Sequence, residues 1–174
     1  CSKRFYPEIK KSYALYSTYK LNDNLNFLSG YMAKFDGLNN KADLLTFSGN
    51  IGAFSWLNGS FEVAVGQRLN VISKAYKGQL NLNSSRLNAH INYIYADKYF
   101  PGFISNALVL SSGITANISK KISMTANYDR NGSKLALDTL FANAPFSENM
   151  NLALNIKFKQ NNSLGLSAHS IGLE

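Results

Sequence analysis

Hydrophobic and polar residues alternate along most of this chain, and residues 106–132 show the pattern most clearly. Leu108 and Ile114 share one parity, while small or polar residues occupy most of the other. The alternation stops at Ser119 and restarts at Ile122. Because side chains along a strand point to opposite faces in turn, this segment predicts two β-strands joined by a tight turn.

The same alternation recurs along the rest of the chain and predicts about ten strands, with no amphipathic helix. The eight further segments that follow it are residues 12–21, 25–35, 44–54, 60–69, 76–83, 87–95, 150–159 and 164–173. The sequence therefore predicts one all-β domain over 1–174, an antiparallel up-and-down meander. Residues 1–11 form its leading loop.

The connections between these strands alternate between short and long. Tight turns are expected at Asp23-Asn24 and at residues 57–59, 84–86, 119–121 and 160–162. The longer connections are residues 36–43, 70–75, 96–106 and 130–149. Short turns at one end and longer loops at the other, between strands of about ten residues, are typical of a transmembrane β-barrel.

In this pattern the chain resembles bacterial outer-membrane β-barrel proteins of the porin and receptor type, across essentially its whole length. Its Asn-, Lys- and Tyr-rich composition is similar to that of Bacteroidota outer-membrane proteins. The resemblance implies a location in the bacterial outer membrane and contact with outer-membrane lipid. It also implies a role as a pore, a transporter or a translocon scaffold.

Alternation alone does not say whether the apolar face meets lipid or a protein core, and a soluble β-sandwich binding module remains the alternative. The polar parity is rich in Ser, Asn, Gly and Thr, which suits a polar lumen. Charges are nearly absent from mid-strand positions of the apolar parity. Aromatic residues also collect near strand ends, as in interfacial girdles. They are Tyr13, Tyr31, Phe35, Tyr76, Tyr93, Tyr95 and Tyr128 toward the long connections, and Phe54, Trp56, Phe61 and Phe158 toward the short turns.

Composition narrows the function classes further. Charged residues make up 16% of the chain, well below the roughly 25% of an ordinary soluble domain. Uninterrupted apolar runs reach only four residues, whereas a transmembrane helix needs about 20. The net charge of +8 comes from 18 basic and 10 acidic residues. Because the basic residues are scattered along the chain, nucleic-acid binding is not expected.

Candidate lumen-facing residues are the ionisable side chains of the polar parity: Lys20, Lys34, Glu62, Arg68, Lys77, His90, Asp129 and Lys157. If they face one lumen, its field is mildly basic and favours anionic solutes. The alternative is that they pair with one another or with solvent. Both interpretations remain open at the level of sequence.

Catalytic and metal chemistry find little support in the sequence. His90 and His169 are the only histidines, with no neighbouring cysteine and no HExxH spacing. Ser170 follows His169 directly, but adjacent strand residues face opposite ways. We therefore expect neither an enzyme, nor a cofactor, nor a metal site.

The loop at residues 97–106 is unusually aromatic, with Tyr99, Phe100 and Phe103 around Pro101-Gly102. These residues are candidates for contact with a partner, for constriction of a pore, or for packing inward.

Cys1 is the only cysteine, and a cysteine at this position resembles the lipid-modified start of a bacterial lipoprotein. A surface-anchored lipoprotein that binds a partner is therefore a second hypothesis.

The ends of the predicted meander raise a question of closure. With five short turns on one rim, both termini fall on the opposite rim, whereas complete single-chain barrels of the resembled family have theirs at the short-turn rim. We therefore expect that the chain does not close a barrel alone, and that further strands or another subunit complete it. An extra strand at residues 134–141 would reverse this inference.

Overall fold

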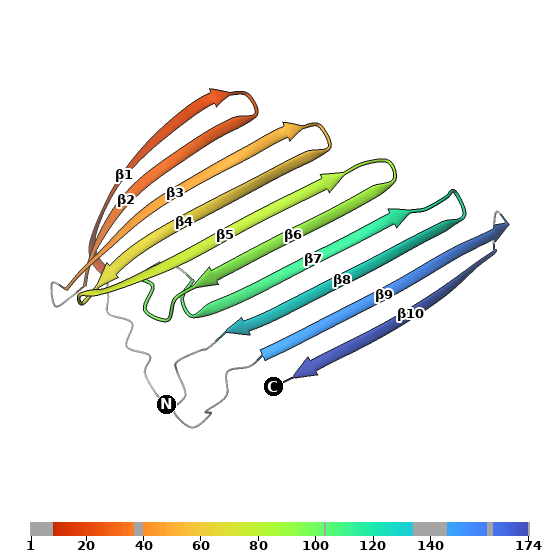
Figure 1. Cartoon of the computed structure of the whole chain (residues 1–174). Helices are drawn as coiled ribbons and strands as arrows, with labels where there is room; N and C mark the ends of the chain where they lie inside the picture. Colours follow the sequence, from red (N-terminus) through yellow and green to blue (C-terminus); the bar gives the residue numbers. More distant parts are fainter. Residues whose placement is uncertain (1–8, 37–39, 103, 134–145, 160–161, 174) are drawn as a thin grey trace.

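A computed structural model describes residues 9–36, 40–102, 104–133, 146–159 and 162–173. These residues form ten strands in one sheet, with the order of the sheet following the order of the chain (Figure 1). The strands are β1 (Ile9–Asn22), β2 (Leu25–Asp36), β3 (Lys41–Phe54), β4 (Leu57–Arg68), β5 (Val71–Asn83), β6 (Leu87–Ala96), β7 (Ala107–Asn117), β8 (Ile122–Ser133), β9 (Phe146–Lys159) and β10 (Asn162–Leu173). The predicted all-β, antiparallel meander is confirmed.

The sheet is open, because β1 and β10 each have a single neighbour within the described residues. The expectation that the chain does not close on itself is therefore confirmed. The described strands also make one layer, and not the two packed sheets of a sandwich. No helix of this part of the chain is long and apolar enough to cross a membrane. Cys1 lies outside the described residues, and so do residues 134–141, where an extra strand was considered.

Two connections differ from the sequence-based expectation. The sequence predicts a long loop at residues 70–75, but only Leu69 and Asn70 separate β4 from β5. Both adopt positive φ angles, 49° and 65°, which is the geometry of a two-residue hairpin turn. The strict alternation of short and long connections is therefore wrong at this point. The turn expected at 57–59 also falls earlier, because β4 begins at Leu57.

Strand β1 begins at Ile9, so the leading loop expected over residues 1–11 ends sooner. The C-terminal ends of β1, β3, β5, β7 and β9 lie at one end of the sheet, here called the turn rim, beside the N-terminal ends of the even-numbered strands. The opposite end of the sheet is called the loop rim.

The strand register sorts the side chains into two faces. One face, here called the apolar face, carries Leu45, Ile91, Ile114, Met124 and Leu152, together with the other side chains of their parity. Most of the large hydrophobic side chains that remain exposed belong to it, including Leu45 at 59%. The opposite, polar face carries the parity of Ser60, His90, Asn127 and His169.

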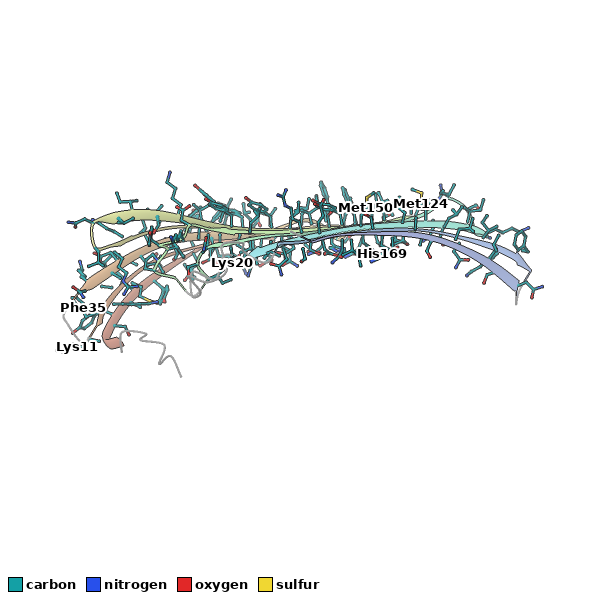
Figure 2. All side chains as sticks on the ribbon, turned by 90° about the horizontal axis from the view of Figure 1, so that it is seen from below. Lys11, Lys20, Phe35, Met124, Met150 and His169 are labelled. Atoms are coloured by element: carbon teal, nitrogen blue, oxygen red, sulfur yellow. The ribbon has the colours of Figure 1, made fainter. Side chains whose placement is uncertain are left out.

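The sheet is bent, and the direction of the bend distinguishes the two faces. Figure 2 shows both side edges of the sheet turning toward the face that holds Lys20 and His169. Met124 and Met150 project from the opposite, outward-bulging side. The apolar face is therefore convex and the polar face concave.

The hydrophobic band on the convex face shifts along the strands from one side of the sheet to the other. At the loop rim it ends in charged residues: Lys11, Lys41, Asp43, Lys74, Arg130 and Glu148. The register row of Lys74 lies two residues closer to the turn rim than that of Asp43. The row of Arg130 lies four residues closer still.

The edge of the band therefore moves by about one residue per strand. With about 3.3 Å per residue and about 4.8 Å between strands, such a shift corresponds to strands tilted by about 35–40°.

Candidate functional site

The concave face carries a continuous row of polar side chains, formed by residues that lie directly opposite one another on neighbouring strands. From β1 to β9 its members are Lys20, Asn26, Asn50, Ser60, Gln79, Asn92, Ser111, Asp129 and Asn149. Strand order alone brings them together, since each strand contributes one residue of the polar parity.

A second row lies two residues nearer the turn rim. From β4 to β10 it runs through Asn58, Asn81, His90, Gly113, Asn127, Asn151 and His169. Asn81 Nδ2 donates a hydrogen bond to Asn58 Oδ1 at 3.1 Å. At Gly113 an added β-carbon would come within 2.4 Å of His90 Cε1, so the glycine leaves the space that the imidazole occupies.

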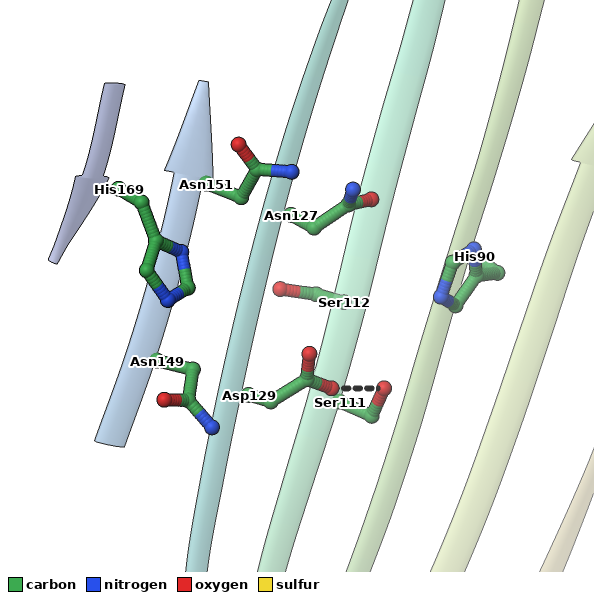
Figure 3. A pocket seen from close by; sticks show the side chains of 8 residues that line it. All are labelled: His90, Ser111, Ser112, Asn127, Asp129, Asn149, Asn151 and His169. Atoms are coloured by element: carbon green, nitrogen blue, oxygen red, sulfur yellow. Dashed lines mark hydrogen bonds between the residues drawn. The ribbon is translucent and has the colours of Figure 1, made fainter. Parts of the chain in front are cut away.

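Between β6 and β10 these rows enclose an open trough of about 550 Å³ (Figure 3). His90 and His169 stand at its two sides, with asparagine side chains between them. Ser111 Oγ donates to Asp129 Oδ1 at 2.5 Å. A second trough of about 390 Å³ lies closer to the turn rim between β2 and β5, where Asn, Ser and Gln side chains line it.

All the predicted lumen-facing residues lie on the concave face, but they do not form one cationic cluster. Lys20 Nζ forms an ion pair with Asp23 at 2.7 Å. Lys77 lies directly opposite Glu62. Arg68 lies at the β4–β5 turn of the loop rim. His90 and Asp129 line the larger trough, whereas Lys157 lies near the end of β9 at the turn rim.

The aromatic loop at residues 97–106 folds onto the concave face near the loop rim. Phe100 is buried against Ala64 and Ala96, with Leu44 and Ala75 packed around this small cluster. The inward-packing interpretation of Phe100 is thus confirmed.

Pro101 and Tyr99 show how the loop meets the sheet. Pro101 lies so close to Gly66 that an added β-carbon would come within 2.4 Å of its ring. The backbone oxygen of Pro101 lies 3.5 Å from Lys34 Nζ, which donates to it. Tyr99 remains 60% exposed, and Phe103 lies outside the described residues. The loop thus covers part of the concave face while leaving Tyr99 accessible.

Asp97 fastens the base of this loop. Its carboxylate accepts hydrogen bonds from the Lys74 backbone N–H at 2.7 Å and from the Tyr95 hydroxyl at 2.7 Å. Its backbone oxygen accepts from the N–H groups of Phe100 at 3.1 Å and Asn106 at 3.0 Å. The Tyr95 bond, followed by the Lys74 bond, lowers the pKa of the Asp97 carboxyl below its ordinary value. These hydrogen bonds therefore hold the base of the loop and favour the ionised form of the Asp97 carboxylate.

Tyrosine residues on the convex face hydrogen-bond acidic partners near the loop rim. The Tyr31 hydroxyl donates to Asp43, and Tyr128 interacts with Glu148 of the neighbouring strand β9. At the turn rim, the rings of Phe54 and Trp56 stack with centroids 5.0 Å apart. Aromatic side chains thus occur near both ends of the strands, with polar partners at the loop rim.

The geometry offers little for catalysis or metal binding in the described part of the chain. His90 and His169 lie four strands apart, on β6 and β10. The described residues include no group of three or more metal-ligating side chains.

The sequence analysis did not identify Asp97, Gly66 or the asparagine rows. The rows were detectable as Asn residues on the polar parity, but the roles of Asp97 and Gly66 depend on contacts with other strands.

No protein-family model, curated protein or solved structure matches the chain.

Proposed function

We propose that this chain forms part of the wall of a bacterial outer-membrane β-barrel that serves as a pore, a transporter or a translocon scaffold. In this proposal the convex face contacts lipid and the concave face lines an aqueous passage. The observation that carries it is the pairing of curvature with polarity. A soluble barrel buries its apolar face on the concave side, whereas a membrane barrel with a water-filled interior has the reverse arrangement.

Two further observations support the lipid contact. The shift of the hydrophobic band by about one residue per strand corresponds to a tilt of about 35–40°, which falls within the typical range for barrel strands. The side chains that end the band are charged residues and tyrosines near the loop rim. Tyrosine has an apolar ring and a polar tip, which suits the boundary between hydrocarbon and water.

The edge strands β1 and β10 would need further strands beside them in a membrane. In hydrocarbon, unpaired backbone groups along β1 and β10 would cost several kcal/mol each. Further strands or another subunit would cover them in this proposal. Because β1 and β10 are the edge strands of the described sheet, a strand added beside either one can continue the antiparallel pattern.

The folded-in loop gives the passage its shape. Phe100 and Pro101 fill space over β4 and β6 near the loop rim, so solutes would pass beside this loop and along the uncovered polar rows. Its seat is made of small residues, Ala64, Gly66 and Ala96, which allow the close approach.

Membrane association provides the direct test. In the cells that make it, where its partner strands are present, the chain should remain in the membrane pellet after extraction with alkaline carbonate and with urea. It should enter solution only with detergent. A chain that stays soluble and monomeric without detergent would contradict the proposal, because nothing would then cover the exposed convex face.

A further inference from the structure

The concave face between β6 and β10 combines many hydrogen-bonding groups with little net charge. In the larger trough the ionisable side chains are His90, Asp129 and His169. The Asp129 carboxylate is already bonded to Ser111 at 2.5 Å. The remaining side chains of the concave parity in this lining are those of Asn127, Asn149 and Asn151. A solute in this trough would therefore meet mostly neutral polar groups.

The lysine and arginine side chains predicted to face a lumen lie outside this trough, and Lys157 lies near the turn rim. Lys20 is paired with Asp23 at 2.7 Å, and Lys34 donates to Pro101 of the folded-in loop. Lys77 lies opposite Glu62, and Arg68 lies at the loop rim. Among the described residues, no lysine or arginine lines the larger trough. Its chemistry is not that of a phosphate or carboxylate site, which uses such side chains.

The Asn side chains of the trough, in contrast, match a ligand that both donates and accepts hydrogen bonds. A carboxamide offers two N–H donors and an accepting oxygen, and a serine hydroxyl offers both roles. Sugar hydroxyl groups have the same dual capacity. An apolar solute would leave these groups without partners, at a cost of about 1–3 kcal/mol for each group that loses its water.

We propose that the trough between β6 and β10 binds uncharged, hydroxyl-rich solutes of the saccharide class. This proposal rests on the proposed function, because it names the solute for the same concave face. The volume of about 550 Å³ falls within the usual range of small-ligand sites, about 300–1,000 Å³. Asn127 and Asn151, directly opposite one another on β8 and β9, provide the central pair of amides.

The test is a calorimetric titration of the full chain in detergent micelles with maltotriose, citrate and spermidine as probes. Maltotriose should give saturable binding that is insensitive to added salt, and the two charged probes should bind more weakly. Asn151→Ala and Asn127→Ala should each weaken maltotriose binding about three- to tenfold, which is the effect of losing one ordinary hydrogen bond.

The matched control is Asn155→Ala, on the same strand and the same face but outside the trough, and it should leave binding unchanged. Absence of maltotriose binding, tighter binding of citrate, or an equal loss in Asn155→Ala would overturn the saccharide assignment. If the chain resists carbonate extraction but gives one of these results, only the assignment fails. If it also leaves the membrane pellet, the proposed membrane function fails as well.

Discussion

Pro101 lies against Gly66 so closely that a β-carbon on the glycine would come within 2.4 Å of Pro101 Cγ. The two residues are brought together by the folding of the β6–β7 loop onto the concave face, where Phe100 is also buried. The position of this loop is therefore sensitive to one methyl group on β4.

Gly66→Ala should displace the loop, because the rigid Pro101 ring cannot rotate away as a flexible side chain could. Overpacking of this kind costs about 1–3 kcal/mol. Hydrogen exchange should report it as faster exchange of the Phe100 and Asn106 amides, which bond to Asp97. Gly78→Ala is the control, because a β-carbon there meets nothing within 4 Å. Equal exchange in the two variants would argue against the close contact.

Phe100→Ala and Tyr99→Ala should differ, although the residues are adjacent. Phe100 is 9% exposed within a small apolar cluster, whereas Tyr99 is 60% exposed. Removal of a buried phenylalanine ring costs about 3–5 kcal/mol, and the low end applies here because the cluster is small. The Phe100 variant should lose loop protection and become open to limited proteolysis between residues 97 and 106. A similar cleavage rate in the Tyr99 variant would contradict the packed position of Phe100.

Acid should release the same loop only at unusually low pH. The pKa of Asp97 is lowered in the folded chain, so its contribution to loop stability is complete above the ordinary pKa of an aspartate, about 3.9. That contribution is lost as the pH falls through the lowered pKa. Fluorescence from a label at Ser105 should stay constant from neutral pH to about pH 4 and change below it.

The Asp97→Asn variant is the control for this pH dependence. Its side chain has one accepting oxygen in place of two, so the loop should be looser at neutral pH and should show no acid transition. An acid transition that persists in this variant would assign the titration to another group.

Arginine substitutions should distinguish the two parities of β7. Ile114 lies on the convex face and is 42% exposed, whereas Thr115 lies on the concave face near Thr125. If the convex face meets lipid, Ile114→Arg should cost about 2–4 kcal/mol, and Thr115→Arg should cost much less because its charge reaches water. Urea unfolding from vesicles measures both values. Equal costs on the two parities would exclude a strand with one lipid face.

Much of the fold could be predicted from the sequence, because a period of two residues is a local signal. All ten strands follow from it, as does the sorting of Lys20, His90 and Lys157 onto one face. The β4–β5 turn could not be predicted in the same way. Leu69 adopts a left-handed conformation there, which is uncommon for a residue other than Gly, Asn or Asp.

The direction of sheet curvature could not be predicted from the sequence either, because the same alternating pattern is compatible with either face being concave. Phe100 packs against Ala64, which is distant from it along the chain, as well as against the nearby Ala96, so its burial depends on tertiary packing. The polar rows arise from register, which assembles single Asn residues of separate strands into one surface.

Neighbouring residues of β6 provide the most direct test of which face meets lipid. Ile91 is 48% exposed on the convex face, and His90 lines the concave trough. A fluorophore is attached to Ile91→Cys or to His90→Cys, with Cys1→Ser removing the only native cysteine, and each chain is reconstituted in vesicles. The label at position 91 should be quenched by nitroxide-bearing lipid and shielded from aqueous iodide, and the label at position 90 should show the reverse. Equal quenching at both positions, or lipid contact at position 90, would contradict the lipid-facing convex surface.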